Sequence, residues 1–111
     1  MIDDPWKTDV LMKGLKGSLP IETNISQRLE GVLAKQSPDI LIPCKCNVID
    51  VFYAGDEGGI VCCLDIGGRN TKTAHLVSIT HLTFDRRVPL AREIGVYQRH
   101  RIKKMKQQTA S

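Results

Sequence analysis

The sequence predicts a single α+β domain in which one or more helices are followed by a three-stranded antiparallel meander and a C-terminal helix packed on the sheet. Three observations support this prediction. Apolar residues recur at helical spacing before residue 37 and after residue 88, residues 39–85 are rich in Val, Ile, Cys and Thr, and two glycine-rich segments divide that middle part. With 111 residues, 41% of them hydrophobic, the chain has room for one core, and we expect one domain over 1–111.

The N-terminal segment, residues 1–18, is predicted to form a short helix. Asp4 is a suitable N-cap residue, and Pro5 fits the first helical position. Gly14 and Gly17 each weaken a helix by about 1 kcal/mol. We therefore expect this helix to be short or frayed.

A second helix is predicted over residues 19–36. Its apolar residues stand at i, i+4, i+8, i+11 and i+12, which places them on one face: Ile21, Ile25, Leu29, Val32 and Leu33. Ser18 and Pro20 are typical of a helix start, and Pro38 typically follows a helix end. We expect this face to pack against the core.

Residues 39–85 are predicted to form three antiparallel strands, over about residues 40–53, 60–66 and 72–84. Apolar residues change face within the first strand, which indicates a β-bulge near Val48. The turns between the strands contain Gly58-Gly59 and Gly67-Gly68, and glycine supplies the positive φ angles that such turns require. The third strand has apolar residues on both faces, so its buried face stays open.

A long final helix is predicted over residues 89–107, with a loose tail at 107–111. Pro89 lies in its first turn. At the helical period of about 100° per residue, the apolar residues cluster on one side, which we expect to face the sheet: Ala91, Ile94, Ile102 and Met105. On the opposite side, a stripe about 60° wide contains four basic residues, and we call Arg92, Arg99, Lys103 and Lys106 the basic stripe.

Positive charge is concentrated in the C-terminal quarter of the chain. Residues 86–111 contain eight basic residues and one acid, a net +7, whereas residues 1–85 contain eight basic residues and eleven acids, a net −3. The candidate anion-binding residues are Arg86, Arg87, Arg92, Arg99, Arg101, Lys103, Lys104 and Lys106. Such a segment predicts an anionic partner, either nucleic acid bound without strong sequence readout or an acidic protein, with an affinity that falls steeply with salt.

Two other interpretations of the chain stay open. Cations near the end of a helix also stabilise it through the helix dipole, so the basic stripe could be a solvated outer face. Alternatively, the protein could be a structural or assembly module, without a role in nucleic-acid binding, that forms a homodimer or holds a protein partner through its sheet. A three-stranded sheet leaves two open edges, and the third strand offers apolar groups on both faces.

The predicted order of a helix, three strands and a helix resembles that of double-stranded-RNA-binding domains. In that family a lysine pair starts the second helix, whereas Arg86-Arg87-Val88-Pro89 stands there in this chain. A cystatin-like sheet with one packed helix is equally compatible with the pattern. No motif in the sequence identifies a family.

The cysteines predict neither a metal centre nor a disulfide framework. Cys44-x-Cys46 and Cys62-Cys63 lack the usual Cys-x-x-Cys spacing of zinc sites, and the expected strand pairing separates the two pairs by more than about 10 Å. We expect reduced, buried thiols that pack as small hydrophobic groups. No cofactor is implied.

A catalytic pair of Cys62 and His75 is the strongest enzyme hypothesis that the sequence offers. If the second turn is centred between Gly68 and Arg69, these two residues lie opposite each other, and an imidazole next to a thiol lowers its pKa. A third, orienting group is not evident at a suitable spacing. We therefore predict that the protein is not an enzyme and assign no catalytic residue.

The chain shows no apolar segment near the ~18 residues that a membrane span needs. Its N-terminus, with Asp3 and Asp4, lacks the basic and apolar regions of a signal peptide. We expect a soluble, cytoplasmic protein.

Overall fold

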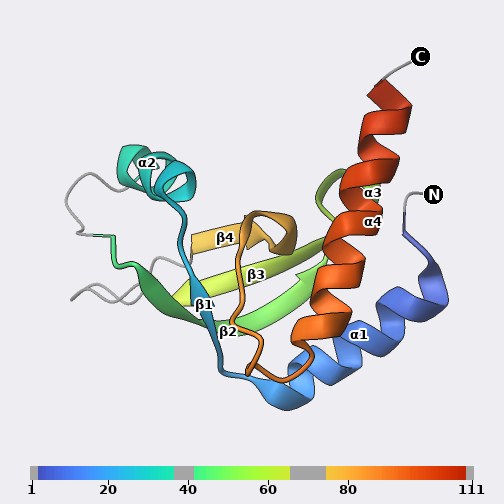
Figure 1. Ribbon diagram of the computed structural model, residues 1–111, viewed down its shortest axis with the longest axis horizontal. Coiled ribbons are helices and arrows are strands. Elements are labelled where there is room, and N and C mark those ends of the chain that lie inside the picture. Colours follow the sequence, from blue (N-terminus) through green and yellow to red (C-terminus); the bar gives the residue numbers. More distant parts are fainter. Residues whose placement is uncertain (1–2, 37–41, 66–74, 110–111) are drawn as a thin grey trace.

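The computed structural model describes residues 3–36, 42–65 and 75–109. Its elements are α1 (Pro5–Ser18), β1 (Ile21–Asn24), α2 (Gln27–Gln36), β2 (Lys45–Tyr53), α3 (Gly55–Gly58), β3 (Ile60–Asp65), β4 (His75–Ser78), the 3-10 turn η1 (Ile79–His81) and α4 (Ala91–Thr109). Figure 1 shows that α1 and α4 lie at one end of the sheet and α2 at the other.

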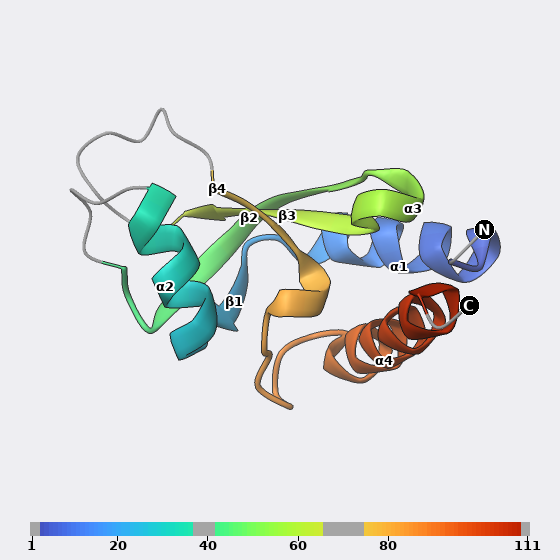
Figure 2. The same cartoon turned by 90° about the horizontal axis from the view of Figure 1, so that it is seen from above.

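A four-stranded antiparallel sheet in the order β1-β2-β3-β4 forms the centre of the molecule. The predicted α+β class, the antiparallel sheet and the C-terminal helix are confirmed, but the predicted number of three strands is wrong. α2, η1 and α4 lie on the same face of the sheet (Figure 2). This arrangement leaves the opposite face without a helix across its middle, as far as the described residues show.

The additional strand, β1, occupies the first part of the predicted helix 19–36. Ile21 pairs with Val48, and burial alternates along the strand, with Ile21 and Thr23 buried and Glu22 exposed. α2 starts only after Ser26, whose hydroxyl accepts a hydrogen bond from the Leu29 N–H at 3.2 Å. The helix prediction failed at this end because pairing with β2 satisfies the backbone of residues 21–24 equally well.

The first predicted hairpin is confirmed in its register. Val51 pairs with Cys62, the register that a turn centred between residues 56 and 57 produces, and the register shifts between Val48 and Asp50, where the sequence predicts a bulge. β2 begins at Lys45 rather than near residue 40. Residues 40 and 41 lie outside the described part of the chain.

Of the third predicted strand, residues 72–74 lie outside the described part of the chain, as do Gly67 and Gly68 of the predicted turn before it, and only the first of the described residues form a strand. β4 covers only His75–Ser78, after which Ile79 to His81 form η1 and the chain leaves the sheet. Thr83 makes one isolated bridge to Asn24, at the far side of the sheet. The mixed apolar pattern of this segment therefore reflects two different local structures rather than a strand buried on both faces.

α1 is longer than the two glycines in it suggested. Its N-cap is Asp4, as predicted, with the carboxylate accepting the Lys7 N–H at 3.1 Å, and the helix continues to Ser18 through both glycines. Burial of Leu11 and Leu15 against the rest of the core compensates for the weak helix propensity. Gly14 also has a packing role, because a Cβ there would lie 2.9 Å from Leu90 Cδ1.

α4 begins two residues later than predicted, at Ala91, and ends at Thr109, beyond the predicted boundary of the tail. Ile94 is buried as predicted, and the Gln98 amide Nε2 donates to the carbonyls of Ile79 and Leu82 at 2.7 and 2.8 Å, which fixes the helix to η1. Ile102 and Met105 were expected to face the core, but each is 41% exposed. Figure 1 shows the reason, since the C-terminal half of α4 projects beyond the sheet.

Candidate anion-binding surface

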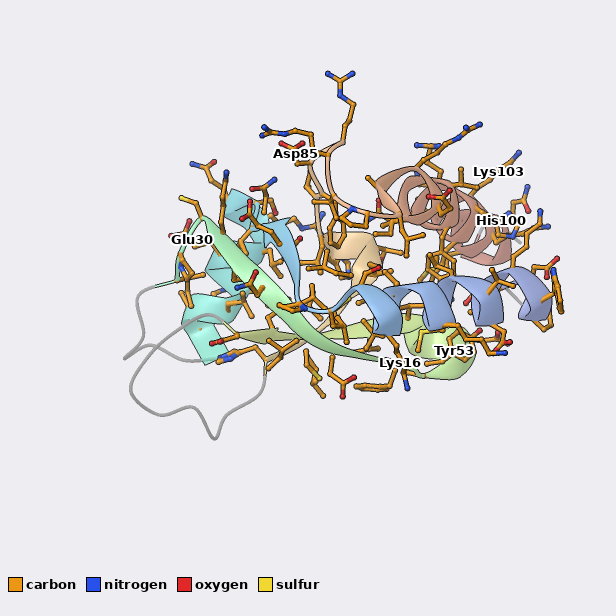
Figure 3. The ribbon with its side chains drawn as sticks, turned by 90° about the horizontal axis from the view of Figure 1, so that it is seen from below. Lys16, Glu30, Tyr53, Asp85, His100 and Lys103 are labelled. Atoms are coloured by element: carbon orange, nitrogen blue, oxygen red, sulfur yellow. The ribbon has the colours of Figure 1, made fainter. Side chains whose placement is uncertain are left out.

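The basic stripe lies on the outer face of α4. Its four residues, Arg92, Arg99, Lys103 and Lys106, are all exposed, whereas Ile94 on the opposite side of the helix is buried. Lys103 projects outward from the helix in Figure 3. Lys104, on the flank of the helix, is exposed too. The structure therefore places five of the eight candidate residues together on one solvated helix.

The two arginines that precede α4 lie in the loop between Phe84 and the helix. Both are exposed, and Arg87 pairs with Asp85, with 3.2 Å between Arg87 Nε and Asp85 Oδ1. The hydrogen bond from the Arg87 side chain lowers the pKa of Asp85 to about 2. Because this carboxylate stays ionised and partly neutralises Arg87, we place Arg86 and Arg87 at the margin of the surface rather than in its centre.

Arg101 is the one candidate residue that the structure removes from this surface. Its side chain is 1% exposed, and Nη1 donates to Asp3 Oδ2 at 3.0 Å, while Nη2 donates to the carbonyl of Asp56 at 2.6 Å. The interpretation of Arg101 as an exposed anion-binding residue is therefore corrected. The sequence contains the signal, since Arg101 follows Ile94 by seven residues, or about two helical turns, and so lies on the same buried side.

Two tyrosines, the buried Tyr97 and the partly exposed Tyr53, bind the buried carboxylate of Asp3. The hydroxyls of Tyr53 and Tyr97 each donate to Asp3 Oδ2 at 2.9 Å, and the Tyr97 hydroxyl accepts the Ile60 N–H at 3.1 Å. Burial, together with the bond to Asp3, raises the pKa of Tyr53 to about 12, and burial likewise raises the pKa of Tyr97. The other carboxylate oxygen, Asp3 Oδ1, is buried without a hydrogen-bond partner. We call these four side chains, Asp3, Tyr53, Tyr97 and Arg101, the Asp3 cluster.

An apolar groove separates α1 from α4 on the side next to the basic stripe. It has a volume of about 410 Å³, and its walls include Trp6 and Val10 of α1 and Leu90 and Val96 around the start of α4. Arg92 belongs both to the basic stripe and to the lining of this groove. His100 also lines it, projecting from α4 on the side of α1 (Figure 3).

The face of the sheet opposite α2 and α4 carries exposed apolar side chains. Leu76 of β4 is 55% exposed, and Ile49 and Phe52 of β2 are exposed as well. Cys63 pairs with both Asp50 and Leu76, which places these three residues in one row across the strands. This face is the surface that the assembly hypothesis requires.

The cysteines are four free thiols, of which Cys46 and Cys62 are buried. Burial raises the pKa of Cys46 to about 11 and that of Cys62 to about 12. Cys62 pairs with Val77 and His75 pairs with Leu64, so the expected register that placed Cys62 opposite His75 is wrong by two residues. A raised thiol pKa is also the reverse of what nucleophilic catalysis requires.

The described residues contain neither a candidate metal site nor a helix that could span a membrane. Within 3–36, 42–65 and 75–109, no group of three or more His, Cys, Asp or Glu side chains could hold a metal ion. None of the helices in those ranges is long and apolar enough to cross a membrane. Comparison of the chain with protein-family models, curated proteins and solved structures gives no match in any of the three, so the side chains themselves have to support the functional conclusion.

Proposed function

We propose that this protein is a non-catalytic binding protein that holds nucleic acid on the outer face of α4 without strong sequence readout. The observation that supports this proposal most is the exposure of all four residues of the basic stripe on one helix face. Lysine and arginine laid on phosphates release condensed counterions, and this term is independent of base sequence.

The dimensions of the basic stripe agree with a short contact on a phosphate backbone. Arg92 and Lys106 are fourteen residues apart, which is about 21 Å along the helix axis at about 1.5 Å per residue. Four phosphate contacts correspond to a slope of about −3.6 in a plot of log affinity against log salt concentration on duplex DNA. Between about 50 and 200 mM salt the affinity should therefore fall roughly a hundredfold.

Fluorescence anisotropy with labelled duplex and single-stranded oligonucleotides over a salt series tests the proposal. Arg99→Gln combined with Lys103→Gln should weaken binding and reduce the steepness of the slope by about 1.8. The matched control is Lys16→Gln combined with Lys35→Gln, which removes the same charge from exposed residues of α1 and α2. An equal loss in both double variants, or binding that does not depend on salt, would contradict a specific role of the basic stripe.

A second candidate function, assembly through the sheet, is favoured by the exposed apolar face around Leu76 and Phe52. Exposed apolar side chains that share one face of a sheet are typical of protein interfaces. Leu76→Ser should then convert a stable homodimer into a monomer, measured as molar mass by light scattering. A protein that is dimeric through this face and does not bind oligonucleotides would favour assembly over nucleic-acid binding.

A further inference from the structure

We infer that the groove between α1 and α4 is a self-association site that holds a second copy of this chain, with Trp6 of each copy inserted into the groove of the other. This inference concerns a different surface from the basic stripe and goes beyond the proposed function. It also differs from assembly through the sheet, because it places the interface at the α1 and α4 end of the molecule (Figures 1 and 2).

The protruding side chain of Trp6 and the apolar groove lie next to each other on the same surface. Trp6 is 75% exposed although it is the single tryptophan of the chain, and it lies at the wall of the groove. Val10 and Val96, on the two helices that line the groove, are each 52% exposed. A two-fold symmetric dimer requires one surface that is complementary to itself, and an adjacent knob and hole satisfy this requirement.

The groove lining carries charges of both signs. Apart from Asp3, which is paired with Arg101, the Asp, Glu, Lys and Arg residues of the lining are two acids and two bases: Asp4, Lys7, Arg92 and Glu93. α1 and its N-cap thus contribute one charge of each sign, and so does α4. Phosphates or an anionic lipid surface would meet repulsion from Asp4 and Glu93, whereas a second copy presents the same two acids and two bases and can pair them.

Self-association leaves the C-terminal part of the basic stripe accessible. On α4 the groove side carries Val96 and His100, whereas Arg99 and Lys106 lie further around the helix and do not line the groove. In the dimer Arg92 therefore lies at the interface, whereas Arg99, Lys103 and Lys106 of each copy flank it. Binding of a partner chain and binding of an oligonucleotide are then separate measurements on the same protein.

The position of Trp6 provides a direct readout. Wild-type protein, examined by sedimentation over a wide range of concentrations, should change from monomer to dimer, and the tryptophan emission should shift to shorter wavelength over the same range. Trp6→Ser should raise the dimer dissociation constant by roughly a thousandfold, because the symmetric dimer loses two inserted tryptophans and each hot spot contributes about thirtyfold. Leu76→Ser, a variant of similar exposure on the sheet, should leave the constant unchanged.

A mixing experiment distinguishes a knob-and-hole interface from a general loss of apolar surface. Trp6→Ser lacks the inserted side chain but keeps the rest of the groove lining, including Val10 and Val96, whereas Val10→Gln combined with Val96→Gln keeps Trp6 but has a polar groove. Each variant alone should be monomeric. The mixture should form a heterodimer that contains one of the two Trp6 contacts of the wild-type dimer. Because Trp6→Ser contains no tryptophan, a blue shift on adding it to the groove variant reports insertion of Trp6 of the groove variant into the groove of Trp6→Ser.

Three outcomes would overturn the inference: a wild-type protein that stays monomeric at every concentration, a dimer whose affinity does not change in Trp6→Ser, or a mixture without a blue shift. Loss of the dimer in Leu76→Ser but not in Trp6→Ser would assign the interface to the sheet instead. Circular dichroism of each variant verifies that it is folded. Anisotropy measurements with Arg99→Gln and Lys103→Gln test oligonucleotide binding separately. A negative result for oligonucleotide binding therefore does not affect the test of self-association, and the reverse also holds.

Discussion

Asp3 and Arg101 form a buried ion pair between residues 98 positions apart in the sequence, with 3.0 Å between Asp3 Oδ2 and Arg101 Nη1 and 1% exposure of both side chains. The pair connects the residue that precedes the cap of α1 with the middle of α4. A charge removed from water is tolerated only when it is paired and hydrogen-bonded, and the two tyrosines of the Asp3 cluster supply the additional donors. This cluster holds α4 at its place in the fold.

Arg101→Met should lower the free energy of unfolding by about 3–5 kcal/mol, because it leaves the carboxylate of Asp3 buried without a cation. Urea denaturation measures the loss. Arg99→Met, an exposed residue of the same helix, is the control and should change stability by less than about 0.5 kcal/mol. The double variant Asp3→Asn, Arg101→Met should be more stable than the sum of the two single changes implies. A loss below about 1 kcal/mol in Arg101→Met would show that the pair does not matter to stability.

Gly59→Ala should destabilise the protein by roughly 2–4 kcal/mol. Gly59 has a φ of +63°, and a Cβ there would lie 2.6 Å from both Tyr97 Oη and Arg101 Nε. The added methyl group would therefore both strain the backbone and displace the Asp3 cluster. Gly17→Ala is the matched control, since nothing lies within 4 Å of its Cβ position in α1, and it should stabilise the protein by about 0.5–1 kcal/mol. Thermal unfolding that ranks the two variants in the opposite order would contradict this account.

Stability should fall as the pH rises above about 9, because Cys46 and Cys62 hold their protons more tightly in the folded chain than in the unfolded one. The folded pKa values are about 11 and 12 against an ordinary 9.0, so this contribution is complete below pH 9 and is lost as the pH rises through 11 and 12. Each thiol contributes a slope of at most about 1.4 kcal/mol per pH unit. Urea denaturation from about pH 8 to about pH 10 measures the slope, and Cys46→Ala with Cys62→Ala should flatten it.

Alkylation by iodoacetamide at neutral pH should modify Cys44 first and Cys62 last. Cys44 is exposed, whereas Cys62 is buried and its raised pKa leaves little thiolate to react. Mass spectrometry of peptides from a time course gives the order, and the four rates should become similar in urea. If Cys62 reacts as fast as Cys44 in the folded protein, the hypothesis of a nucleophilic cysteine would regain its basis.

The parts of the fold that depend on neighbouring residues were predictable from the sequence. Asp4 caps α1 through a residue three positions away, and the bulge at Val48 and the pairing of Val51 with Cys62 follow from a short hairpin. The spacing of Ile21 and Ile25 did not distinguish a helix from a strand, since β1 exists only because it pairs with β2, 27 residues later in the case of Ile21 and Val48. Local periodicity does not contain that information.

The candidate site likewise has features that local sequence predicts and features that depend on distant contacts. The exposure of Arg92, Arg99, Lys103 and Lys106 follows from the period of a single helix, and the structure agrees with it. The burial of Arg101 depends on Asp3, and the groove depends on how α1 approaches α4 through Gly14 and Leu90. Both features depend on contacts between residues far apart in the sequence, which local sequence patterns do not show.

The long separation between Asp3 and Arg101 has a consequence for how the protein is made. During translation Asp3 is synthesised 98 residues before Arg101, so the cation leaves the ribosome much later than the carboxylate that it pairs with. Until Arg101 is available, burial of the Asp3 carboxylate would leave it without a cation. We therefore expect α1 to reach its native position late, and the apolar residues that α1 covers to stay accessible to chaperones. A chain that ends before Arg101 lacks this cation altogether and leaves the Asp3 cluster incomplete.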